Sequence, residues 1–279
     1  MIPIITILTP TLSPFETVIS HYDWFMSLEN DYFELIIVDQ NDTRSERLAI
    51  ESANNDNFTY VHNRARGLSK NRNIGVKYAR GNFILLLDDD ARFDKKMASR
   101  IINSVKNSEF DILLGAIIDF EGELTSYTPH KRECVVNAFS IEGRVNSNGI
   151  LASTKSVNEI KFDEIMGVGA RFGACEEIDF VVKSIISGYR VKYLPTIKII
   201  HPPKPYDRNK AFSYGRGHGY FAFKLLFRYP SLSCKYLALK KISKCLSKLS
   251  ISIILFRSTK KRNYRSWAYG FIQGFIEAI

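Results

Sequence analysis

Three adjacent carboxylates, Asp88, Asp89 and Asp90, follow the apolar run Phe83–Leu87. Like charges this close repel one another, and none is favoured in an apolar core unless it is paired or binds a metal. Because side chains alternate along an extended chain, Asp88 and Asp90 point the same way if strand geometry persists. Carboxylate oxygens suit Mg²⁺ and Mn²⁺. The triplet is therefore a candidate cation site, and a solvated acidic turn that caps the next helix is the alternative.

A second acidic cluster, Glu176, Glu177 and Asp179, follows the glycine-containing segment Gly167–Cys175. Carboxylates suit the first turn of a helix, because the N-terminal end of the helix dipole is positive. A carboxylate that is held beside a hydroxyl group also acts as a general base. Helix stabilisation and proton transfer both remain open, and the glycines would let the loop close over a site and exclude water.

The elements that must position these carboxylates alternate in type. Short apolar runs precede stretches of helical periodicity, which is the pattern of βα units on a mainly parallel sheet. The carboxyl ends of such strands meet at one edge of the sheet, where ligands bind. The expected strands are 4–8, 33–38, 58–61, 83–87, 112–118, 189–194 and 197–200. The expected helices are 14–28, 45–53, 68–79, 95–106 and 175–187, and residues 119–160 indicate an irregular β-rich insertion.

The order and spacing of the motifs over residues 3–202 resemble those of family-2-like glycosyltransferases with the GT-A fold. The shared features are Thr9-Pro10-Thr11 after the first strand, Asp39 after the second, Gly67, Arg72-Asn73, Ala79-Arg80-Gly81 and the Asp-x-Asp motif at 88–90. The resemblance implies an α/β domain of the Rossmann-like GT-A type, with a mainly parallel sheet flanked by helices. It also implies a metal-dependent, inverting hexosyltransferase-like enzyme that uses a nucleotide-diphosphate sugar.

The resemblance implies roles for individual residues as well. The residues expected around the nucleoside and the rest of the donor are Thr9, Asp39, Arg72, Asp88 and Asp89. Asp90 would bind the divalent metal, Mn²⁺ or Mg²⁺. His201, which follows the last expected strand, would join it, because GT-A enzymes often have a histidine at this place. Taken singly, each residue also has an ordinary structural explanation, and their common order is what favours the functional one.

The second acidic cluster departs from the family pattern at one position. Inverting members resembling this chain carry Glu-Asp here, followed by x-Asp, and one carboxylate of the pair takes the proton of the acceptor hydroxyl. This chain has Glu176-Glu177, with Glu where Asp is usual. We assign the base to Glu177, and Glu176 and Asp179 remain alternatives.

The positive charge of the chain is concentrated near its C-terminus. The net charge is +10, yet residues 1–202 carry −4, and residues 203–279 hold 16 Lys and Arg against Asp207 and Glu277. Basic residues that alternate with Tyr, Phe, Leu and Ile are typical of a helical segment on an anionic membrane surface. No apolar stretch reaches the roughly 20 residues that span a bilayer. We therefore expect a GT-A catalytic domain at 1–202 and a basic, aromatic-rich helical appendage at 203–279.

The expected partners are a nucleotide-sugar donor, with a UDP-sugar as the expected form, and a glycan or lipid-linked glycan acceptor. The resemblance suggests bacterial surface polysaccharide synthesis. The four dispersed cysteines indicate reduced thiols, and the N-terminus lacks the leader and cleavage site of a secretory signal. The expected location is the cytoplasm, peripheral to the inner face of the cell membrane.

A binding module is the main alternative. In that interpretation the basic tail binds anionic lipid or nucleic acid and is itself the function. It leaves both acidic clusters without a purpose, and the sequence has no nucleic-acid-binding motif, so we expect no nucleic acid partner. Nucleotidyl transfer ranks last, because the segment Thr9–Pro14 is not a glycine-rich, lysine-containing phosphate loop.

Overall fold

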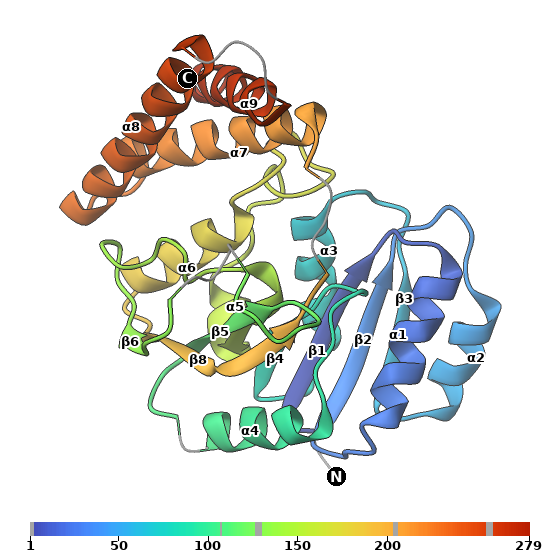
Figure 1. Ribbon diagram of the computed structural model, residues 1–279. Helices are drawn as coiled ribbons and strands as arrows, with labels where there is room; N and C mark the ends of the chain where they lie inside the picture. The colour runs from blue at the N-terminus through green and yellow to red at the C-terminus, as the bar shows by residue number, and fades with distance from the viewer. Residues whose placement is uncertain (1–2, 107, 126–129, 203–205, 255–258) are drawn as a thin grey trace.

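The computed structural model describes residues 3–106, 108–125, 130–202, 206–254 and 259–279. At its centre lies an eight-stranded sheet with the strand order β3-β2-β1-β4-β7-β5-β8-β6 (Figure 1). The strands are β1 Ile5–Thr11, β2 Phe33–Asp39, β3 Phe58–His62, β4 Phe83–Leu86, β5 Ile112–Ile118, β6 Cys134–Val135, β7 Ile150–Ser153 and β8 Val191–Ile200.

Most strands of the sheet run in one direction. The pairs β1–β2, β1–β4, β2–β3 and β5–β8 are parallel. Strand β7 is antiparallel to both β4 and β5, so these two strands also share a direction. The carboxyl ends of β1, β2, β4 and β8 therefore lie at the same edge, as expected of a mainly parallel sheet.

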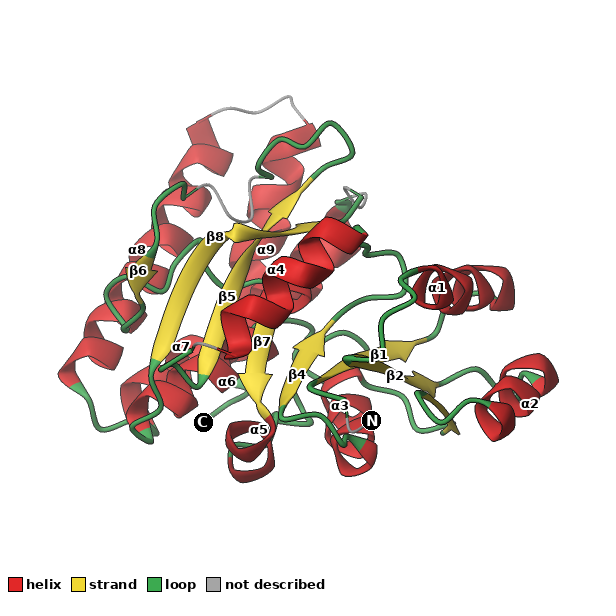
Figure 2. Cartoon of the chain, turned by 90° about the horizontal axis from the view of Figure 1, so that it is seen from below, coloured by secondary structure: helices red, strands yellow, loops and turns green. Residues whose placement is uncertain are grey.

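Helices cover both faces of the sheet (Figure 2). They are α1 Phe15–Ser27, α2 Glu46–Asn54, α3 Leu68–Gly75, α4 Lys95–Lys106, α5 Thr154–Glu159, α6 Glu176–Ile186, α7 Arg208–Phe227, α8 Leu232–Ile254 and α9 Thr259–Ile276. Side chains of α1 and α4 pack with Ile5 and Ile7 of β1, whereas Leu8 belongs to the core that α5 and α6 cover. This alternation explains why the central strands read as continuous apolar runs, since both of their faces are buried.

Residues 119–160 differ from the expected irregular insertion. They contain β7, which lies in the middle of the sheet between β4 and β5. The strand has only four residues and is antiparallel to its neighbours. Neither its length nor a preceding helix therefore identified it as a strand in the sequence. Two other boundaries also differ: α3 ends at Gly75 and continues as a 3₁₀ turn at Val76–Tyr78, and the two strands expected after 189 form the single strand β8.

The C-terminal helices pack against each other and against the remainder of the chain. Helices α7 and α9 are parallel and in close contact, because added Cβ atoms at Gly215 and Gly219 of α7 would meet the carbonyl oxygens of Trp267 and Phe271 at 2.1 and 2.0 Å. On another side of α7, a Cβ at Gly217 would meet the backbone of Ala174, just before α6. The expected helical tail is present, and it rests on the loop that leads to the second acidic cluster.

The division of the chain at residue 202 stays a prediction, and Pro203 lies outside the described residues. Among the residues that the structure describes, no helix is both long enough and apolar enough to cross a membrane.

Candidate active site

Asp88, Asp90 and His201 meet at the carboxyl edge of the sheet. Each offers one ligand atom, and these atoms all lie within 4.8 Å of one another. His201 Nε2 is 3.3 Å from Asp90 Oδ1 and 3.7 Å from Asp88 Oδ2. The side chains of Asp88 and Asp90 are 25% and 27% exposed, so an ion can reach them from solvent.

The backbone explains how residues so far apart in sequence meet. After β4 the chain turns through the acidic triplet, and Arg92 then forms an antiparallel bridge with Ile200 at the end of β8. Arg92 N–H donates to the Ile200 carbonyl at 2.9 Å, and Ile200 N–H donates back at 2.8 Å. His201 N–H donates to the carbonyl of Ile118, the last residue of β5, at 3.0 Å. These bonds set His201 beside the carboxylates.

The three side chains suit a hard divalent cation. Carboxylate oxygens bind Mg²⁺ and Mn²⁺, and neutral imidazole is compatible with Mn²⁺. His201 Nε2 is buried and forms no hydrogen bond with the described residues. A buried ring nitrogen without a hydrogen bond is costly, and a metal ion would supply the missing partner. The donor set therefore fits a metal site made of the expected Asp90 and His201 together with Asp88, a residue that the resemblance assigns to the donor.

Asp88 is held in place by Asn148, a residue that the sequence interpretation missed. The Asp88 N–H donates to Asn148 Oδ1 at 2.6 Å, and Asn148 Nδ2 donates to Asp88 Oδ2 at 3.2 Å. Asn148 is only 2% exposed and lies in the 3₁₀ turn Ser147–Gly149 that precedes β7. The Asn-Ser-Asn-Gly turn was visible in the sequence, but nothing placed it beside the acidic triplet.

Asp89 is not part of the cluster that Asp88, Asp90 and His201 form. It accepts a hydrogen bond from the Thr11 hydroxyl and is 7% exposed. Burial raises the pKa of Asp89, although the Thr11 hydrogen bond opposes the effect. Asp89 therefore helps to anchor the turn to the end of β1, and its expected contact with the donor stays a prediction.

Thr9 is enclosed in the same region. Burial and the nearby Arg92 hold the pKa of His21 well below its ordinary value, so its imidazole is neutral. Arg92 Nη1 donates to His21 Nδ1 at 2.6 Å, which leaves the proton on Nε2 to be donated to Thr9 Oγ1 at 3.0 Å. Thr9 and His21 are fully buried. Arg92 also donates to the Asp89 carbonyl at 2.7 Å, so Thr9 is linked to the acidic turn through His21 and Arg92. The contact of Thr9 with a nucleoside stays a prediction.

Asp39 ends β2 with both carboxylate oxygens engaged. Tyr60 donates its hydroxyl to one oxygen at 2.5 Å, and the other accepts from Asn41 N and Nδ2 at 2.9 and 2.8 Å. The neighbouring Gln40 donates to the Thr11 carbonyl at 3.2 Å and accepts from Gly67 N–H at 3.0 Å. Asp39 therefore lies at the expected edge, beside the segment that leads into α3.

Arg72 and Glu176 form a buried ion pair. Arg72 Nη1 lies 3.1 Å from Glu176 Oε1, with side-chain exposures of 2% and 5%. The guanidinium also lies over the Phe162 ring, 5.3 Å from its centroid. Arg72 is thus not a solvated helix residue. It joins α3 to α6 through Glu176, an alternative to Glu177 as the base, and its expected contact with the donor stays a prediction.

Glu177 is the one residue of the second acidic cluster that is partly exposed, although its carboxyl group is buried. It is partly exposed, whereas Glu176 is 4% and Asp179 0% exposed. Burial of its carboxyl group and the adjacent Glu176 carboxylate raise the pKa of Glu177 well above its ordinary value. A raised pKa brings a carboxylate closer to the range in which it accepts a proton efficiently at neutral pH.

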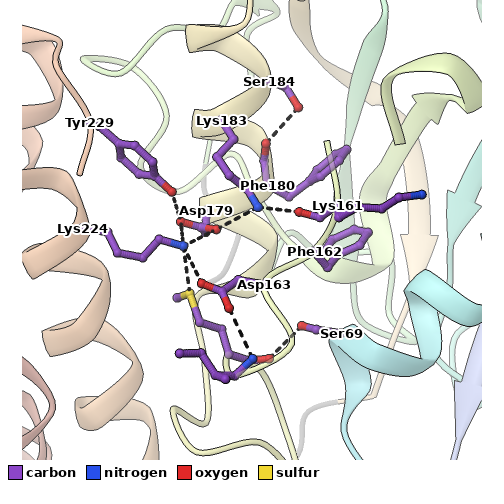
Figure 3. Close-up of polar contacts among 12 residues, drawn as sticks. Ser69, Lys161, Phe162, Asp163, Asp179, Phe180, Lys183, Ser184, Lys224 and Tyr229 are labelled. Carbon is purple, nitrogen blue, oxygen red and sulfur yellow. Dashed lines mark hydrogen bonds and ion pairs between the residues drawn. The ribbon is translucent and has the colours of Figure 1, made fainter. Parts of the chain in front are cut away.

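Asp179 lies inside a cluster that joins α6 to α7 (Figure 3). Lys224 Nζ lies 2.8 Å from Asp179 Oδ1 and 2.7 Å from Asp163 Oδ2. Tyr229 donates its hydroxyl to Asp179 Oδ1, and Lys183 Nζ lies 3.3 Å from Oδ2. Both oxygens of Asp179 are therefore engaged, which suits a structural carboxylate better than one that meets a substrate.

The glycine-containing loop before α6 lies over the beginning of α3. Ser69 donates its hydroxyl to the Met166 carbonyl at 2.7 Å, and Leu68 N–H donates to the Val168 carbonyl at 2.9 Å. Gly167 has a φ of 98°, and a Cβ there would lie about 3.1 Å from atoms of Ser69 and Glu176. The loop thus connects the Arg72–Glu176 pair with the cluster around Asp179. Its expected closure over an acceptor stays a prediction.

Comparison with known families supports the motif analysis. A sequence model of the family described as Glycosyl transferase family 2 matches residues 16–172. An uncharacterized glycosyltransferase of Haemophilus influenzae is 25% identical over 166 residues, which are 54% of this chain and 51% of that protein. The uncharacterized glycosyltransferase EpsJ of Bacillus subtilis is 27% identical over 135 residues, 48% of this chain and 39% of that protein. The matched part thus spans about half or less of these curated relatives.

Solved structures share the fold over nearly the whole chain. The mannosyltransferase PcManGT of Pyrobaculum calidifontis, in complex with GDP-Man and Mn²⁺, has a TM-score of 0.63 at 12% identity and covers 100% of this chain and 87% of its own. S. aureus TarS 1–349 in complex with UDP has a TM-score of 0.55 at 17% identity, and the match covers 97% of this chain and 91% of that one. At these identities the likeness shows the fold alone, and it confirms the expected GT-A architecture.

Proposed function

The chain belongs to glycosyl transferase family 2, and we propose that it moves a sugar from a UDP-sugar to a glycan or lipid-linked glycan with inversion at the anomeric carbon. The observation that carries the proposal is the meeting of Asp88, Asp90 and His201 at the carboxyl edge of the sheet. A GT-A sheet with an acidic, metal-competent edge suits a donor that carries a diphosphate. Structural relatives that bind UDP, UDP-GlcNAc or GDP-Man support a nucleotide-sugar donor.

Asp88, Asp90 and His201 would hold Mn²⁺ or Mg²⁺. A cation bound there supplies positive charge that offsets the charge on the departing nucleotide diphosphate. Asn148 fixes the orientation of Asp88 from the inner side. Hydrogen bonds of this kind commonly tune a metal site, because they hold its ligands in one orientation.

Glu177 is the base in this proposal. A sugar hydroxyl is a poor nucleophile, and a carboxylate that takes its proton lets attack on the anomeric carbon proceed. Glu176 is neutralised by Arg72, and Asp179 is enclosed by Lys224 and Tyr229. Glu177 alone among the three is partly exposed, next to the loop that lies over α3.

The outer face of α8 supports a location at an anionic membrane surface, beside a lipid-linked acceptor. Leu232, Leu239 and Leu246 are 86%, 61% and 59% exposed, and helical periodicity places them on one side of α8. Lys240 and Lys244, also exposed, lie beside this apolar stripe, both on the same side of it. Exposed apolar side chains next to lysines are typical of a helix that lies on anionic lipid. In this account the enzyme acts in the cytoplasm, in the synthesis of a bacterial surface polysaccharide.

A donor panel tests the proposed reaction. We would incubate the protein with Mn²⁺ and UDP-glucose, UDP-GlcNAc, UDP-galactose or GDP-mannose, and measure nucleotide release with and without a glycan extract. Release of UDP that depends on the extract supports the proposal, and NMR of the product should show the anomeric configuration opposite to that of the donor. Release of GDP alone would identify a GDP-sugar, in place of a UDP-sugar, as the donor. A product with the same anomeric configuration as the donor would exclude Glu177 as the base of a direct displacement.

Vesicle sedimentation tests the membrane location separately. Wild-type protein should sediment with phosphatidylcholine vesicles that contain phosphatidylglycerol, and Leu239→Glu with Leu246→Glu should abolish this. The matched control is Ile50→Glu on α2, where Ile50 is 62% exposed. Equal sedimentation of the α8 variant and the wild type would contradict the assignment of this face.

A further inference from the structure

A basic cavity lies between the N-terminal parts of α7 and α9. It has a volume of about 360 Å³ and is lined by Arg208, Arg262, Arg265, Ser266 and Tyr269. None of these lining residues is acidic. Among the described residues, no ion pair joins the three arginines to a carboxylate. We call this cavity the arginine groove.

The parallel packing of α7 and α9 creates the arginine groove. Close contacts pair Gly270 with Phe212 and Gly274 with Arg216. The residue numbers of these contacts increase in the same direction along α7 and α9, so the N-terminal ends of the two helices lie at the same end of the pair (Figure 1). Arg208 is the first residue of α7, and α9 begins at Thr259. The positive ends of two helix dipoles thus add to the charge of the arginines.

The acidic residues of the tail are engaged elsewhere. Asp207 accepts the Lys210 N–H at 2.8 Å as the N-cap of α7. Glu277 lies near the other end of α9, where Arg216 Nη2 is 2.6 Å and Arg171 Nε is 3.4 Å away. Neither lines the arginine groove. Three guanidinium groups therefore face a cavity without a counter-ion from this part of the chain.

One of the arginines is oriented by a hydrogen bond. Arg265 donates through Nε and Nη2 to the Tyr269 hydroxyl at 3.3 and 3.1 Å, and its guanidinium lies 5.3 Å from the centroid of the tyrosine ring. A guanidinium fork held in one plane matches the oxygens of a phosphate. The Ser266 hydroxyl adds a neutral donor to the lining.

From this lining we propose that the arginine groove binds a phosphate group of the acceptor, an inference that rests on the proposed function. Arg208 follows His201 by seven positions, so their Cα atoms are at most about 25 Å apart even in an extended chain. An acceptor that carries a phosphate or diphosphate can therefore reach from the groove towards the sugar donor. The phosphate belongs either to a lipid headgroup or lipid carrier in a bilayer, or to a soluble phosphorylated glycan.

Inorganic pyrophosphate is the first probe. Its binding would be measured by calorimetry in EDTA, so that the metal site does not contribute, on the wild type and on Arg262→Ala with Arg265→Ala. We expect at least tenfold weaker binding in this groove variant, because two charge-assisted contacts are lost. Lys96→Ala with Arg100→Ala on α4 removes the same charge from two other exposed residues and should leave binding unchanged.

A second variant and a donor control keep the result interpretable. Arg208→Gln alters the groove from α7 alone and should weaken pyrophosphate binding in the same direction. UDP binding with Mn²⁺ should be equal in the wild type and the groove variants, since the donor site is separate. Equal pyrophosphate affinity in the wild type and both groove variants overturns the proposal, whether or not UDP binds.

Vesicles distinguish the two sources of phosphate. Phosphatidylcholine vesicles with and without phosphatidylglycerol would be sedimented with the wild type and the groove variants. If the groove takes lipid phosphate, the groove variants lose binding to the anionic vesicles as well as to pyrophosphate. If it takes a soluble phosphorylated glycan, only pyrophosphate binding is lost. Failure of UDP to bind the wild type would instead refute the proposed function.

Discussion

The ammonium group of Lys224 on α7 lies 2.8 Å from the carboxylate of Asp179 on α6, and both side chains are buried. Burial alone would lower the pKa of Lys224, but Asp179 and Asp163 outweigh this effect and raise it. Figure 3 shows Lys224 and Tyr229 directed at the same carboxylate. The tail is thereby attached to the helix that carries the candidate base.

Replacement of Lys224 should destabilise the protein strongly. Lys224→Met leaves Asp179 and Asp163 without their shared cation, and loss of one partner of a buried pair costs about 3–5 kcal/mol. Urea unfolding would measure the free energy of unfolding. Arg228→Met, at an exposed position just after α7, is the control and should change it by less than about 0.5 kcal/mol. Unchanged stability of Lys224→Met would contradict a stabilising role of Lys224. Adding Asp179→Asn to Lys224→Met should restore part of the lost stability, because it removes a buried charge that has lost its partner.

Glu177→Gln should abolish transfer while donor binding persists. The amide keeps the shape of the side chain but cannot take the proton of the acceptor, and general base catalysis contributes about 10²–10⁴-fold in rate. The measurement is kcat for sugar transfer, together with the Kd for UDP and Mn²⁺. Glu46→Gln, in the exposed first turn of α2, is the matched control. Retention of wild-type kcat by Glu177→Gln would move the base to another residue.

The same substitution should change stability in a pH-dependent way. The pKa of Glu177 is raised in the folded protein, so the folded state binds this proton more tightly than the unfolded state does. That contribution is complete below the ordinary pKa of about 4.5 and is lost as pH rises through the raised value. Relative to the wild type, Glu177→Gln should therefore gain more in Tm at pH 8 than at pH 4. An equal difference in Tm at both pH values would be inconsistent with the raised pKa.

Asn148 should prove important for the metal although it is not a ligand. Asn148→Ala removes both hydrogen bonds to Asp88, and loss of such a supporting residue typically weakens metal binding about 10–100-fold. Titration with Mn²⁺, followed by calorimetry or electron paramagnetic resonance, measures the Kd. Asn158→Ala, at an exposed position of α5, controls for the loss of an amide. Unaltered Mn²⁺ affinity in Asn148→Ala would show that Asp88 needs no such support.

Local sequence patterns were enough to predict most of the catalytic fold. The apolar strands before Asp39 and Asp88 and the helix at 95–106 appear where periodicity placed them. Strand β7 was not predicted, because it has only four residues and runs antiparallel between β4 and β5, and no local pattern indicates which strands it pairs with. The position of Asn148 beside Asp88 follows from that pairing and was missed with it.

The candidate site was predictable as a list of residues and not as a set of contacts. The ordered motifs pointed to Asp88, Asp90 and His201, which the structure brings together. No local pattern indicated that Arg72 would pair with Glu176, since 104 positions separate them and the pair depends on the packing of α3 against α6. The attachment of α7 to Asp179 was likewise hidden, because the lysines of an amphipathic tail look alike until one of them is buried.

Metal-dependent binding of UDP tests the central claim most directly. Calorimetry would compare UDP binding to the wild type with Mn²⁺ and with EDTA, and to Asp90→Ala with Mn²⁺. Glu46→Ala, which removes one exposed carboxylate from α2, serves as the control. We predict micromolar binding to the wild type and to Glu46→Ala that is lost in EDTA, and no binding to Asp90→Ala even with Mn²⁺. Absence of binding to UDP, GDP and dTDP alike, in the presence of Mn²⁺, would contradict it.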